Sequence, residues 1–63
     1  MQIGDVIRAR FVSLPEMSPG ASETVRYPIR KGTVMYMHPK GRYLVAECKW
    51  VRESFFPEDV EVL

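Results

Sequence analysis

The chain is short and has an ordinary globular composition. It has 63 residues, of which 46% are hydrophobic and 27% charged, and its formal net charge is +1. A chain of this length buries only about 60% of its unfolded surface, so we expect one small domain over residues 1–63 and no large catalytic cleft. The nearly balanced charge indicates neither a strongly basic nucleic-acid-binding protein nor an acidic mimic.

The sequence does not provide the disulfides or metal sites that commonly stabilise a small domain. It has one cysteine, Cys48, and one histidine, so we expect no internal disulfide, no metal and no cofactor. The amino terminus lacks the basic and apolar regions of a signal peptide, and the longest stretch without a charged residue is Gly32 to Pro39. We therefore expect a cytoplasmic protein without a membrane partner, with its thiol reduced.

Strand signals dominate, because proline or glycine interrupts every helical spacing of apolar residues. The first predicted strand is Ile3 to Val12, in which apolar side chains alternate with arginines from Val6 onward. The next segment, Ser13 to Pro28, holds three prolines and a glycine and is predicted to be a long loop. A loop of this length either folds into a hairpin of its own or is a flexible connector, and the sequence leaves both alternatives open.

Two further strands, Ile29 to His38 and Arg42 to Lys49, are predicted on either side of a tight turn. Pro39 suits the first central position of this turn, and Gly41 suits its left-handed position. A three-residue loop would place His38 opposite Arg42. This register predicts an inner face of Val34, Tyr36, Leu44, Ala46 and Cys48, and an outer face of Thr33, Met35, Met37, Tyr43, Val45 and Glu47.

The remaining elements complete an all-β pattern. Before a strand at Arg52 to Phe56, Lys49-Trp50-Val51 offers no typical turn residue, so the chain either turns tightly with unusual residues or continues as one bent strand. Pro57 to Val60 predicts a single helical turn, and Val60 to Leu63 a short closing strand. A five-stranded small barrel with a long first loop is the expected architecture, because it leaves few free strand edges.

This order of elements resembles the SH3-like small barrel over the whole chain. The local patterns Gly4-Asp5-Val6, Lys31-Gly32-Thr33-Val34 and Gly41-Arg42-Tyr43-Leu44-Val45 resemble the KOW-like variant, whose members often bind RNA, ribosomes or RNA polymerase. The run from Gly32 to Tyr43, with Arg52-Glu53-Ser54-Phe55, is similar to small uncharacterised proteins of mobile elements and phages in Gram-positive bacteria. The motifs of peptide-binding SH3 domains are absent, so we do not expect recognition of polyproline ligands.

Charge is distributed unevenly along the chain. The segment Thr24 to Ala46 has five basic residues and no acid, whereas Glu47 to Leu63 has five acids and two basic residues. If the central segment follows one side of the barrel, its cations can contact a phosphate backbone and a tyrosine can stack on a base. The predicted nucleic-acid or ribonucleoprotein site is Arg26, Arg30, Lys31, Lys40, Arg42 and Tyr43, and an ordinary solvated surface is the alternative.

The same region also fits a protein-binding module, such as an accessory or inhibitor protein of a mobile element. Met35, Met37, Tyr43 and Val45 form the apolar part of the predicted outer face, and methionine is adaptable at interaction surfaces. The long loop could instead fold over this face and bury it, or two copies of the chain could associate through it. An aromatic cage built from Tyr27, Tyr36, Tyr43, Trp50 and Phe55 is a further alternative, for which core packing is the simpler use.

Catalysis is not expected. His38 has no evident catalytic partner, and Cys48 alternates with apolar residues as a core thiol does. Ser54 beside Glu53 does not amount to a nucleophile with a base. The sequence thus predicts a binding module that has no enzyme activity and no small-molecule substrate.

Overall fold

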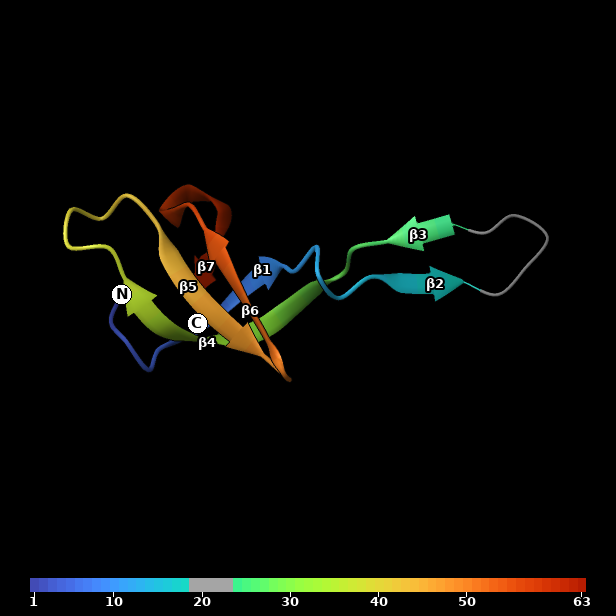
Figure 1. Cartoon of the computed structure of the whole chain (residues 1–63), viewed down its shortest axis with the longest axis horizontal. Helices are drawn as coiled ribbons and strands as arrows, with labels where there is room; N and C mark the ends of the chain where they lie inside the picture. The colour runs from blue at the N-terminus through green and yellow to red at the C-terminus, as the bar shows by residue number, and fades with distance from the viewer. Residues whose placement is uncertain (19–23) are drawn as a thin grey trace.

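The computed structural model describes residues 1–18 and 24–63, and in these residues the protein is all-β. Five strands form one antiparallel sheet in the order β6-β5-β4-β1-β7, and β2 and β3 form a separate two-stranded ribbon (Figure 1). The elements are β1 (Val6–Arg10), β2 (Glu16–Ser18), β3 (Thr24–Arg26), β4 (Ile29–Met37), β5 (Leu44–Cys48), β6 (Val51–Phe55), the 3-10 turn η1 (Pro57–Asp59) and β7 (Glu61–Val62).

One face of the large sheet carries the hydrophobic core. The predicted alternation in β1 is confirmed, since Ile7 and Ala9 are buried while Arg8 and Arg10 are exposed. Cys48 is also buried, as expected. The buried set is Ile7, Ala9, Phe11, Val34, Leu44, Ala46 and Cys48, with Leu14, Met37, Phe55 and Val60 packed against it.

Phe11 packs directly over Gly32, where the backbone of β4 has no side chain. A methyl group at Gly32 would lie 2.7 Å from Cζ of Phe11 and 3.0 Å from the carbonyl oxygen of Glu47. The ring of Phe11 also meets that of Phe55 edge to face, with centroids 4.9 Å apart. Gly32 therefore makes room for the largest fully buried side chain of the core.

Because of a β-bulge in β4, two residues of this strand lie on faces other than those predicted. Near the sheet centre Val34 pairs with Ala46, as predicted, but beyond the bulge Tyr36 pairs with Val45 and Met37 with Leu44. The extra residue reverses the alternation. The predicted positions of Tyr36 and Met37 are consequently wrong, because Tyr36 is exposed and Met37 packs against the core.

The loop after β4 is also one residue longer than predicted. His38 donates its amide hydrogen to the carbonyl of Tyr43 over 2.9 Å, so His38 lies opposite Tyr43 and the predicted pairing with Arg42 is wrong. The left-handed conformation predicted for Gly41 is confirmed by its φ of 68°. At the next connection the chain turns tightly, because Cys48 pairs with Val51 and Lys49 adopts a φ of 56°.

The segment between β1 and β4 forms a hairpin arm that projects from the sheet (Figure 1). In this arm Glu16 pairs with Arg26 and Ser18 with Thr24, so the hairpin alternative for the long loop is the observed one. The molecule measures 46 × 19 × 18 Å, and its radius of gyration is 13.0 Å. A compact chain of this length has a radius of gyration of about 10.6 Å, so the arm accounts for a markedly elongated shape.

Glu53 connects the edge strand β6 to the end of β1. Its carboxylate accepts hydrogen bonds from the backbone amides of Val12 and Ser13, over 3.0 and 2.9 Å, and from the Ser13 hydroxyl over 2.6 Å. Two amides that follow β1 thereby find an acceptor on a strand that is not their neighbour in the sheet order. The sheet is therefore curled, since a side chain of β6 reaches the backbone at the end of β1.

The predicted helical turn and closing strand are both present. Pro57 begins η1, which is held by a hydrogen bond from the amide of Asp59 to the carbonyl of Phe56 over 2.9 Å. β7 then pairs with β1 through Ile7 and Arg8 and is shorter than the predicted strand. The 3-10 turn thus carries the chain from one edge of the sheet to the other.

Replacing Gly32 by alanine should lower the free energy of unfolding by about 1–3 kcal/mol, because the new methyl group overlaps Phe11. Urea denaturation followed by circular dichroism measures the loss. In a Phe11→Leu background the same substitution should cost less, since part of the overlap is gone. Equal costs in both backgrounds would show that the overlap with Phe11 is not the cause.

Replacing Glu53 by alanine should cost about 2 kcal/mol, because three donors lose a charged acceptor. Glu53→Gln should cost less, since it keeps one acceptor oxygen. Glu58→Ala is the matched control, because it removes an exposed carboxylate without a hydrogen bond among the described residues. A control that loses as much stability as Glu53→Ala would contradict the role given to these hydrogen bonds.

Candidate functional site

The loop from His38 to Tyr43 lies at the end of the sheet opposite the arm (Figure 1). Hydrogen bonds within the loop hold its backbone in a defined conformation. The amide of Gly41 donates to the carbonyl of His38 over 2.8 Å, and the amide of Lys40 donates to Nδ1 of His38 over 3.0 Å. The side chain of His38 is therefore part of the turn.

Three aromatic side chains gather where this loop meets the sheet. The ring centroid of Tyr43 lies 6.0 Å from that of Tyr36 and 5.1 Å from that of His38. Tyr36 is 43% exposed and Tyr43 is 38% exposed. We call Tyr36, His38 and Tyr43 the aromatic platform. Its rings are close enough to stabilise one another, and two of them remain accessible to a ligand.

Two cations accompany the platform. Lys40 and Arg42 belong to the same loop, and both are exposed. Among residues 1–18 and 24–63 the one ion pair joins Arg52 to Glu47 over 2.8 Å, so neither loop cation is neutralised by a carboxylate there. The loop thus presents two positive charges beside exposed aromatic rings.

The other half of the predicted nucleic-acid site lies elsewhere. Arg26 is the last residue of β3, in the arm that projects from the end of the sheet opposite the loop (Figure 1). Arg30 is half-buried, and one of its terminal nitrogens donates to the carbonyl of Leu14 over 3.4 Å. Lys31 is exposed on β4, directly opposite Arg8 of β1. The structure therefore groups Lys40, Arg42 and Tyr43 and places Arg26, Arg30 and Lys31 apart from them.

The predicted apolar face is partly rearranged by the bulge. Met35 and Tyr43 remain exposed, and Val45 is half-buried. Met37 is withdrawn from this face, because it packs against the core. The arm projects away from the sheet that carries these residues (Figure 1), so β2 and β3 do not cover them.

Tyr36 is the residue of the platform that the sequence misplaces. Strict alternation assigns it to the interior, and nothing in Met35-Tyr36-Met37 marks a bulge. One signal is available, because a buried tyrosine needs a hydrogen-bond partner for its hydroxyl and the predicted core offers none. A small apolar core therefore favours Met37 over Tyr36 at its rim.

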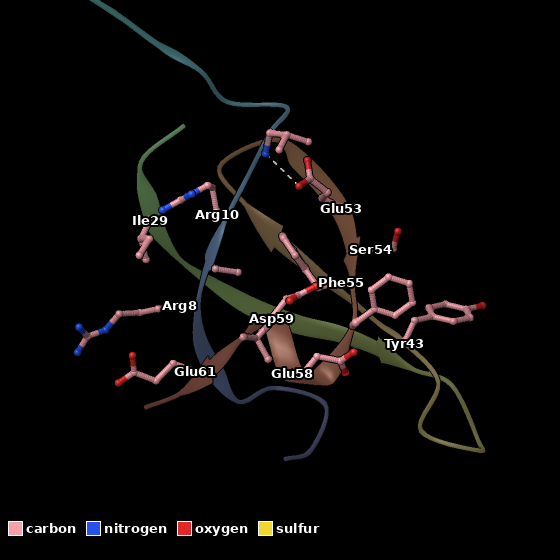
Figure 2. A pocket seen from close by; sticks show the side chains of 14 residues that line it. Arg8, Arg10, Ile29, Tyr43, Glu53, Ser54, Phe55, Glu58, Asp59 and Glu61 are labelled. Atoms are coloured by element: carbon pink, nitrogen blue, oxygen red, sulfur yellow. Dashed lines mark hydrogen bonds between the residues drawn. The ribbon is translucent and has the colours of Figure 1, made fainter. Parts of the chain in front are cut away.

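A groove of about 740 Å³ lies between β1 and β7 on one side and β6 and η1 on the other (Figure 2). Arg8, Arg10 and Glu61 lie on the side of β1 and β7, Glu58 and Asp59 lie on η1, and Tyr43 also lines the groove. Glu53 and Ser54 also line it, but the Glu53 carboxylate already binds Val12 and Ser13. That carboxylate is therefore engaged in holding the sheet rather than placed as a base for Ser54.

Comparisons with known proteins identify no relative of this chain. No family model, no curated protein and no solved structure matches the chain. Within the described ranges, no three metal-ligating side chains gather at one point. No helix in those ranges has the length and apolar character needed to cross a membrane.

Replacing His38 by alanine should lower the free energy of unfolding by about 1 kcal/mol, because the amide of Lys40 loses its acceptor. His38→Asn should lose less, since an asparagine side chain readily accepts from the amide two residues later. Urea denaturation of both variants gives the comparison. Equal losses for alanine and asparagine would contradict the importance of this hydrogen bond.

Proposed function

We propose that the protein is a small non-catalytic binding module that contacts nucleic acid or a ribonucleoprotein through the aromatic platform with Lys40 and Arg42. The observation that carries the proposal is the presence of two adjacent exposed tyrosines and two unneutralised cations at one well-tied loop in the described part of the chain. Nucleic acids offer the matching chemistry, because bases stack on aromatic rings and phosphates attract lysine and arginine.

The expected contributions are sufficient for a contact of moderate strength. Stacking of a base on an aromatic side chain contributes about 1–3 kcal/mol. Each phosphate contact adds attraction that weakens with salt, because binding releases counterions. A ligand held by one or two stacked bases and two phosphates therefore binds through the loop alone, without the distant cations of β3 and β4.

The fold supports this proposal by analogy. A five-stranded antiparallel sheet with a 3-10 turn before its last strand is consistent with an SH3-like barrel. The pattern that resembles KOW-like barrels, Gly41 to Val45, begins within the candidate loop. We propose a KOW-like binding module of the cytoplasm, and the function assigned to it depends on the site rather than on the fold.

A protein partner is the second candidate. Met35 lies exposed near Tyr36 in the bulge, and Tyr43 is close to Tyr36. These side chains form an apolar surface without Met37, and methionine and tyrosine are common at adaptable interfaces. Binding of a protein partner would depend on Met35 and would not change when the charges of Lys40 and Arg42 are reversed, which distinguishes it from nucleic-acid binding.

The test is fluorescence anisotropy of single-stranded, duplex and hairpin nucleic acids at roughly 50 and 200 mM salt. The proposal expects binding that weakens at the higher salt and that falls about tenfold or more in a Lys40→Glu, Arg42→Glu variant. Lys31→Glu is the matched control, because it reverses an exposed cation outside the loop.

Tyrosine substitutions separate stacking from charge. Tyr36→Leu should weaken binding, whereas Tyr27→Leu, at an exposed tyrosine of the arm, should not. Absence of binding at low salt would overturn the nucleic-acid proposal. Loss of a protein partner in Met35→Glu, with the loop cations unimportant, would favour the alternative.

A further inference from the structure

The aromatic surface of the platform continues across the sheet to Phe56. Leu44 pairs with Phe55 at the end of the β5–β6 ladder, and Phe56 keeps an extended backbone with φ −80° and ψ 147°. The next cross-strand neighbours are therefore Tyr43 and Phe56. Because Leu44 and Phe55 face the core, alternation places these two aromatic side chains on the outer face. Both also line the groove, where Tyr43 lies across from Arg8 in Figure 2.

Aromatic side chains thus cross three neighbouring strands at one end of the sheet. Tyr36 is in β4, Tyr43 directly precedes β5, and Phe56 directly follows β6. These three strands are adjacent in the sheet order. Phe56 is 59% exposed, which is more than either tyrosine. We call Tyr36, Tyr43 and Phe56 the aromatic row.

The spacing of the aromatic row suits successive bases of one nucleic-acid strand. Neighbouring strands of a sheet lie about 4.8 Å apart, and the ring centroids of Tyr36 and Tyr43 are 6.0 Å apart. One base for each exposed ring is the arrangement that the row offers, and any base can take part because every base has a π face. Bases within a duplex are covered by their neighbours, so it is unpaired bases that stack on such a row.

Charge around the row limits the phosphate contacts to one backbone. The loop between β4 and β5 contributes Lys40 and Arg42, which no carboxylate neutralises in the described part of the chain. Beyond Phe56 the groove has charges of both signs. Apart from the engaged Glu53, its charged lining residues are Arg8, Arg10, Glu58, Asp59 and Glu61. A duplex would bring a second phosphate backbone, across a groove about 6–12 Å wide, to this mixed surface. A single strand keeps its phosphates beside the loop and presents its bases to the row.

We propose that the ligand of this site is single-stranded nucleic acid, of which three consecutive unpaired bases stack on Tyr36, Tyr43 and Phe56. The inference rests on the proposed function, because it extends the same site from β4 and β5 to β6. It defines what the site selects, namely the unpaired bases of a strand, loop or bulge and not a duplex. Phe56 separates the two proposals, since the proposed function needs the platform and its two cations alone.

Oligonucleotides of about six nucleotides, in which abasic sites replace chosen bases, test the row at a constant number of phosphates. One strand keeps two consecutive central bases and another keeps three. Fluorescence anisotropy at roughly 50 mM salt measures the affinity of each. For the native chain the third base should tighten binding about fivefold or more. For Phe56→Leu it should tighten binding less than about twofold, because the third ring is gone.

Trp50→Leu is the matched control for the loss of an exposed aromatic side chain. Trp50 is more exposed than Phe56 and lies at the other end of the β5–β6 hairpin, so its replacement should leave the gain from the third base unchanged. Circular dichroism should show that Phe56→Leu remains folded, because the exposed ring is replaced by another apolar side chain. A duplex of about twelve base pairs should bind about tenfold or more weakly than either of its separated strands.

The outcomes separate this inference from the proposed function. The same gain from the third base in Phe56→Leu as in the native chain would overturn the aromatic row, and so would a duplex that binds as tightly as its separated strands. Either result leaves the platform as the nucleic-acid site. Absence of binding to any strand at low salt would overturn both proposals.

Discussion

The hydrogen bonds of the Glu53 carboxylate are the constraint on which the rest of the structure depends. They join residues that are 40 and 41 positions apart and bring the end of β1 against β6, two strands that are not neighbours in the sheet. Phe11 and Phe55 meet in the same place, so polar and aromatic contacts act together. A sheet of five strands has one face to bury, and curling it onto itself lets a short chain cover that face without a second layer. The arm and the groove both begin where this contact is made.

Much of the architecture is predictable from residue patterns, because a half-buried strand must alternate. The buried face of β1, the core position of Cys48, the left-handed Gly41 and the 3-10 turn at Pro57 all follow from local rules. The bulge in β4 does not, since it is selected by the whole core: a buried Tyr36 would leave a hydroxyl without a partner, while Met37 fits the rim. The pairing within the arm is equally hard to foresee, because residues rich in proline and glycine are compatible with a hairpin or a flexible connector.

Sequence patterns likewise predict only part of the candidate site. Charge along the chain identifies Lys40 and Arg42, which remain together because they occupy one loop. It also groups them with Arg26, Arg30 and Lys31, which the structure separates. Nine residues of β4 span about 30 Å, so cations at the two ends of this strand cannot act on one small ligand. Alternation separates neighbours as well, since Lys31 faces solvent and Arg30 is half-buried.

The tight turn between β5 and β6 has a practical consequence for spectroscopy. It places Trp50, the sole tryptophan of the chain, at a hairpin tip where the residue is 83% exposed. An indole already surrounded by water changes its surroundings little when the chain unfolds, so its emission is a poor reporter of folding in this protein. The same exposure makes Trp50 a sensitive probe for anything that covers this end of the sheet, because contact with another surface would shift its emission to shorter wavelength.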